Sequence, residues 1–109
     1  MSAAKIAELN DALRKSFSPT LGKIMMTAGV AALPSEIRAE LFHKVQTFDA
    51  FTEDNDPHHE HDMAFFEVNG RKWYFKIDYY DLKIKLGSPD PADLTKTCRV
   101  MTIGAAEDY

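Results

Sequence analysis

Groups that could do chemistry are concentrated in one stretch of this sequence, residues 48–62. The stretch holds six carboxylates and three of the chain's four histidines, and it contains no lysine or arginine. Imidazole and carboxylate groups are ligands for zinc and related metal ions. The candidate metal ligands are His58, His61 and Asp62, and His59, Glu60 and Asp56 are also of suitable type.

The spacing of these groups fits no metal-binding motif. His61-Asp62 is not the paired-histidine H-E-x-x-H helix of zinc hydrolases. An EF-hand loop counted from Asp49 would have Phe51 at its third position and Asp54 where the motif needs glycine. We therefore predict no native metal and no other cofactor. A metal-dependent hydrolase centred on this His/Asp/Glu cluster is the alternative function.

His61 could also serve in acid–base catalysis if a carboxylate oriented its imidazole. Asp62, Asp78 and Asp81 are the candidate partners. The sequence offers no nucleophile motif, because Ser88 lies in a proline-rich loop without the pattern of a nucleophile elbow. We therefore predict no catalytic residue, and the balance favours a protein that is not an enzyme.

The carboxylates have two further interpretations, which are compatible with each other. Asp, Asn and Thr side chains hydrogen-bond to nearby backbone and shape turns, and His61 and Asp62 would then tie the stretch to residues 79–81. A dense carboxylate patch beside aromatic residues also suits binding to a basic surface of another protein. The predicted partner-binding residues are Asp49, Glu53, Asp54, Asp56, Glu60, Asp62, Tyr79 and Tyr80.

The negative charge of the chain is concentrated in one stretch. The net charge is −4, and residues 49–62 alone contribute −6, so no strong basic stripe is left for nucleic-acid phosphates. Cys98 is the only cysteine, which excludes an internal disulfide and indicates a reducing compartment. No apolar run approaches the roughly 20 residues of a bilayer span. We expect a cytoplasmic protein with no membrane contact and no direct contact to nucleic acid.

Hydrophobic spacing predicts helices followed by strands. Apolar residues recur at helical spacing from Ile6 to Phe17, with Arg14 expected on the solvent side. Asn69-Gly70 between two aromatic runs is the signature of a β-hairpin. We expect a single α+β domain over residues 1–109, with two helices packed on one face of a small antiparallel sheet. The predicted helices cover residues 3–17 and 34–48, and the predicted strands cover residues 21–27, 63–68, 72–80 and 97–103.

Several segments taken together resemble a family of small bacterial proteins with no assigned function. They are residues 6–14, 48–57, 60–62, 76–81, 87–93 and 99–103. The resemblance implies members mainly in alphaproteobacteria, often encoded on plasmids and other mobile elements, but no activity and no catalytic residues. The family usually has a small residue, often glycine, at the position of His59, and Phe-Gly at Met63-Ala64.

These observations predict a small non-enzymatic interaction protein that uses an acidic loop and neighbouring aromatic residues. The mobile-element setting implied by the resemblance makes an anti-defence inhibitor, aimed at CRISPR–Cas or a restriction enzyme, the most concrete version. The partner would then be a nucleic-acid-handling defence complex. Exposed aromatic residues on the strand face would also allow a homodimer.

Overall fold

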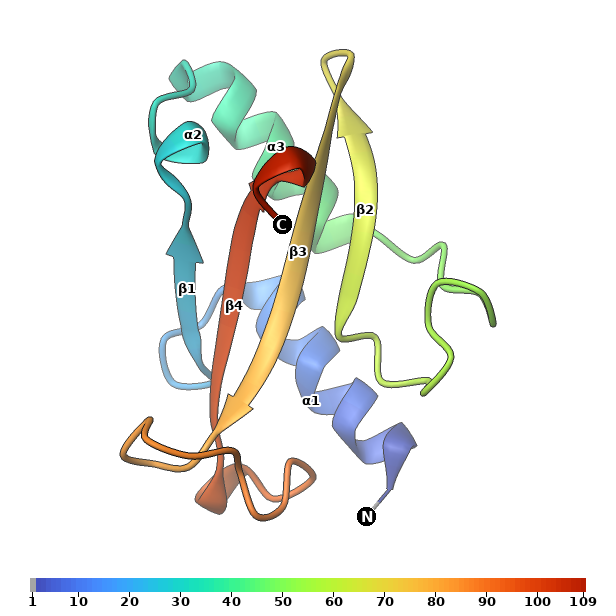
Figure 1. Ribbon diagram of the computed structural model, residues 1–109, viewed down its shortest axis with the longest axis vertical. Coiled ribbons are helices and arrows are strands. Elements are labelled where there is room, and N and C mark those ends of the chain that lie inside the picture. The colour runs from blue at the N-terminus through green and yellow to red at the C-terminus, as the bar shows by residue number, and fades with distance from the viewer. Residues whose placement is uncertain (1) are drawn as a thin grey trace.

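The computed structural model describes residues 2–109 and has an α+β architecture (Figure 1). A four-stranded sheet carries helices on one of its faces, which confirms the predicted fold class. The helices are α1 (Ala3–Ser16), the single-turn α2 (Ala28–Ala31) and α3 (Ser35–Thr47). The strands are β1 (Lys23–Met26), β2 (Met63–Val68), β3 (Arg71–Tyr80) and β4 (Cys98–Ala105), and short 3₁₀ turns lie at Leu94–Lys96 and Ala106–Asp108.

Local sequence signals fix several of these boundaries. Ser2 caps α1, because its Oγ accepts a hydrogen bond from the Lys5 N–H at 3.2 Å. Pro34 directly precedes α3, where the missing proline N–H costs no helical hydrogen bond. Asn69 and Gly70 have φ angles of 55° and 76° and form the tight turn between β2 and β3. The hairpin prediction is confirmed.

The sheet is mixed, whereas the sequence predicts an antiparallel one. Its order is β1-β4-β3-β2; β2, β3 and β4 are antiparallel, but β1 runs parallel to β4, with Lys23 opposite Val100. Residues 27–97 separate these two strands, so no tight turn dictates their direction. The chain pairs β4 with β1 only after α3 and the β2–β3 hairpin have intervened in the sequence.

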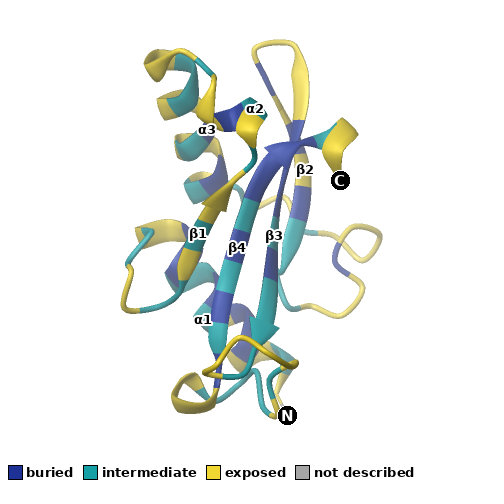
Figure 2. Ribbon diagram, turned by 60° about the vertical axis from the view of Figure 1, so that its left-hand side comes forward, coloured by how far each residue is buried: buried dark blue, intermediate teal, exposed yellow. Residues whose placement is uncertain are grey.

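The core lies between the sheet and the helices. Leu13 of α1 and Leu41 and Val45 of α3 pack with the inward side chains of β3 and β4, among them Phe75 and Met101. Figure 2 shows buried stretches along β3 and β4, and mostly exposed loops at both ends of the sheet. Among the described residues, no helix has the length and apolar character needed to cross a bilayer.

One prediction for α1 is wrong. Arg14 is only 1% exposed and Asn10 is completely buried, whereas Leu9 is half-buried. The face of α1 that meets the sheet is therefore partly polar. These two side chains belong to the arrangement described next.

Candidate functional site

The loop of residues 48–62 is shaped by its own side chains. Asp56 is 4% exposed, and its carboxylate accepts hydrogen bonds from the backbone N–H groups of Glu60 at 3.1 Å and His61 at 3.2 Å. The Asn55 amide accepts from the Thr52 N–H at 2.7 Å and donates to the Ala50 carbonyl at 2.9 Å. The expectation that Asp and Asn side chains shape this stretch is confirmed.

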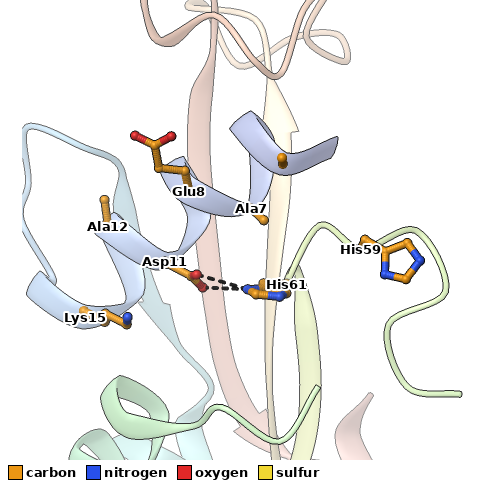
Figure 3. Close-up of a pocket in the computed structure, with 8 residues that line it drawn as sticks. Ala7, Glu8, Asp11, Ala12, Lys15, His59 and His61 are labelled. Atoms are coloured by element: carbon orange, nitrogen blue, oxygen red, sulfur yellow. Dashed lines mark hydrogen bonds and ion pairs between the residues drawn. The ribbon is translucent and has the colours of Figure 1, made fainter. Parts of the chain in front are cut away.

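His61 joins this loop to α1 (Figure 3). Its Nδ1 lies 3.1 and 3.0 Å from the two carboxylate oxygens of Asp11, and its Nε2 lies 3.7 Å from Asp56 Oδ2. The ring stacks on Phe51, with 4.0 Å between centroids and 2° between planes. His61 has a φ of 54°, and these contacts hold it in the left-handed region.

The orienting carboxylate of His61 therefore comes from α1. The prediction that Asp62, Asp78 or Asp81 orients the imidazole of His61 is therefore wrong. Asp78 pairs with Lys76 at 3.4 Å, and Asp81 accepts the backbone N–H groups of its own turn. Asp11 thus orients the ring through Nδ1, while Nε2 lies 3.7 Å from Asp56 Oδ2, beyond hydrogen-bond distance.

Arg14 of α1 binds both Asp11 and the end of α3. Its guanidinium donates to Asp11 at 2.8 Å and to the carbonyl oxygens of Val45 and Phe48 at 2.9 and 2.7 Å. These carbonyls lie at the C-terminal end of α3, where helical carbonyls lack intrahelical partners. The guanidinium also lies 5.4 Å from the ring centroid of Phe51. Arg14 thus couples the end of α3 to the Asp11–His61 pair.

A second polar network lies beside the first. The Asn10 amide donates to the Tyr79 hydroxyl at 2.7 Å and to the Glu60 carbonyl at 2.9 Å, and it accepts from Arg99 Nε at 2.8 Å. The Tyr79 hydroxyl donates to the Glu60 carboxylate at 2.8 Å. Burial raises the pKa of Tyr79 and lowers the pKa of Arg99. Glu60 is thereby fixed to β3 and α1.

The predicted partner-binding residues fall into two groups in the structure. Asp49, Glu53 and Asp54 are exposed, and Glu53 lies 3.4 Å from His59 Nε2. Asp56, Glu60 and Tyr79 are engaged inside the protein, while Asp62 and Tyr80 are half-buried. Burial raises the pKa of Asp62.

The candidate metal ligands do not come together. Over residues 2–109, no three His, Cys, Asp or Glu side chains converge in a way that could hold a metal ion. His58 and His59 are exposed, whereas His61 is turned towards Asp11. The His/Asp/Glu cluster that a metal-dependent hydrolase would need is therefore not assembled within residues 2–109.

Two shallow hollows lie on either side of the Asp11–His61 pair. The first is floored by alanines of α1 and edged by Glu8, Lys15 and His59. The second is bounded by Arg14, Phe48 and Asp49. Both are open surface depressions, and Asp11 and His61 line each of them.

The residues missed by the sequence reading are Asn10, Asp11, Arg14 and Arg99, which hydrophobic periodicity assigns to solvent or leaves unassigned. A signal for them does exist. All four lie in segments on which the family resemblance depends, residues 6–14 and 99–103. These segments meet residues 48–57, 60–62 and 76–81 through the two polar networks.

Comparison with known proteins supports the resemblance at the level of the family. No curated protein and no solved structure matches this chain. A family model does match, over residues 26–108, and its description is "Protein of unknown function (DUF3768)". Because the match covers most of the chain, this protein belongs to the DUF3768 family, as the prediction of an uncharacterised family anticipated.

Proposed function

We propose that this protein is a non-enzymatic interaction protein, and that Asp49, Glu53 and Asp54 bind a basic surface of another protein. The observation that carries the proposal is the contrast within one loop. Asp56 and Asn55 fix the backbone from inside, while these three carboxylates are left exposed. Among the described residues, their only ion pair within 4 Å is the one between Glu53 and His59.

A fixed cluster of like charges suits recognition. A cationic partner would bring opposite charges to these exposed carboxylates, and such complementarity speeds encounter and sets register. Since the loop is already ordered, its backbone would lose little conformational freedom on binding. Tyr79 is engaged in the interior, so Tyr80 is the aromatic candidate that remains for an anchor.

The finer version of the proposal is an anti-defence inhibitor. Proteins that handle nucleic acid carry basic surfaces for phosphates, and fixed carboxylates could occupy such a surface. The support for this version is the local charge together with the mobile-element setting that the family resemblance implies. The partner would be a CRISPR–Cas or restriction complex in the cytoplasm.

The test compares two variants of equal net charge. Glu53→Lys plus Asp54→Lys reverses two charges of the loop. Glu36→Lys plus Glu40→Lys makes the same change of charge at exposed positions of α3. Affinity purification from a native host identifies the proteins that each variant retains. Capture of purified CRISPR–Cas and restriction complexes then compares how strongly wild type and the two variants bind. We expect capture to be lost only with the loop variant. Equal capture by wild type and the loop variant would refute binding through the acidic loop.

A further inference from the structure

An exposed aliphatic turn lies between β3 and β4, at a distance from the acidic loop. Leu82, Ile84 and Leu86 are 65%, 42% and 72% exposed, and they alternate with the exposed Lys83 and Lys85. Figure 1 shows the turn at the foot of the sheet, on the opposite side from residues 48–62. Leu94, which is 40% exposed, lines the same small hollow as Leu82.

The fold holds this turn in place. The Asp81 N–H donates to the Leu86 carbonyl at 2.9 Å, and the Ile84 N–H donates to the Asp81 carbonyl at 3.0 Å. Asp81 Oδ1 accepts from the N–H groups of Lys83 and Lys85 at 3.1 and 3.0 Å. The three aliphatic side chains are therefore exposed by a closed, hydrogen-bonded turn.

Ile84 adds backbone strain to this exposure. Its φ is 56°, in the left-handed region, which is a genuine outlier for a β-branched residue. Strain of this kind persists where the surroundings impose it, and it concentrates at functional positions. Neither the strain nor the exposure of the leucines stabilises the monomer, so both point to something that the turn contacts.

We propose that residues 82–86 insert into the interface of an anionic lipid membrane. The leucines and Ile84 would enter the acyl boundary, and Lys83 and Lys85 would reach the headgroup phosphates along their aliphatic stems. Neither lysine has an ion-pair partner within 4 Å among residues 2–109. This turn is smaller than a standard protein–protein contact, whereas a lipid surface requires no matching shape.

The surrounding charges limit the affinity to a weak, reversible one. Asp81 closes the turn itself, and Asp90 and Asp93 follow it in the chain; all three accept backbone N–H groups, and Asp93 also lies 3.9 Å from Lys96. The sequence prediction of no membrane contact depends on the absence of a spanning run. Insertion of a short turn into the interface needs no such run.

Co-sedimentation with vesicles tests the proposal. The vesicles are phosphatidylcholine, with or without phosphatidylglycerol, and the key variant is Leu82→Ser plus Leu86→Ser. The matched control, Met25→Ser plus Met26→Ser, removes exposed apolar side chains from β1. We expect wild type and control to bind vesicles that contain phosphatidylglycerol, and binding of the leucine variant to fall at least about tenfold. Lys83→Gln plus Lys85→Gln should weaken binding to vesicles that contain phosphatidylglycerol and leave binding to pure phosphatidylcholine vesicles unchanged.

Three outcomes would overturn the proposal. The first is failure of wild type to sediment with either vesicle, and the second is equal vesicle binding by the leucine variant and wild type. Self-association in analytical ultracentrifugation that is abolished in the leucine variant, without vesicle binding, would make a second copy the occupant. Equal melting temperatures of wild type and variants would show that exposed side chains were removed without unfolding the protein. The result is independent of the acidic-loop mechanism, which uses other residues.

Discussion

Asp56 offers the sharpest test of how the acidic loop is built. Asp56→Ala removes the acceptor for the Glu60 and His61 N–H groups, and it removes the carboxylate 3.7 Å from His61 Nε2. Hydrogen bonds to charged groups contribute about 1.5–3 kcal/mol each. With two such donors and partial access of water to the loop, we expect the free energy of unfolding to fall by about 2–4 kcal/mol. That corresponds to a melting temperature lower by roughly 8–16 °C.

The matched control is Asp54→Ala, which removes an exposed carboxylate from the same loop. A surface change of this kind should alter the free energy of unfolding by no more than about 0.5 kcal/mol. Urea denaturation measures both variants, and an unchanged m value would show that the two-state comparison is fair. Equal destabilisation by the two substitutions would refute the division of the loop into internal and exposed carboxylates.

Three further predictions use other parts of the structure. Arg14→Met removes the guanidinium that donates to Asp11 and to the carbonyls of Val45 and Phe48, so we expect urea denaturation to show a free energy of unfolding lower by about 3 kcal/mol. Burial raises the pKa of Asp62 in the fold, so its favourable contribution is complete below the ordinary value of 3.8 and is lost as the pH rises through the folded pKa. Asp62→Asn should therefore melt higher than wild type at neutral pH and equally in acid; the opposite order would contradict the burial argument. Ile84→Asn should raise the free energy of unfolding by about 1 kcal/mol, because asparagine tolerates a left-handed backbone, and should weaken vesicle binding.

The sequence predicts those parts of the fold that depend on local signals. Pro34 marks the start of α3, and Asn69-Gly70 marks the hairpin, because each signal acts within a few residues. The direction of β1 depends on a partner more than seventy residues away along the chain, and no local pattern encodes it. Long-range pairing is therefore where the prediction of an antiparallel sheet fails.

The buried polar residues escape prediction for a different reason. A helical pattern places Arg14 among the charged residues of α1, and only the positions of α3 and Phe51 show that its guanidinium is surrounded. Asp11 likewise looks like a surface carboxylate until His61 is brought to it from fifty residues away. Charged residues are seldom fully buried, so the expectation of exposure is sound in general and wrong when several partners converge.

The two histidines of the loop show how backbone and side-chain requirements differ. His59 and His61 both have a positive φ, at 59° and 54°. The side chain of His59 is exposed and forms an ion pair with Glu53, while its positive φ is a conformation that glycine adopts without strain. The small residue expected there in the family agrees with this requirement. His61 instead contributes its ring to Asp11 and Phe51, and glycine could not replace those contacts. His61 therefore holds the loop in shape, and Asp49, Glu53 and Asp54 are its exposed carboxylates, which the proposed interaction would use.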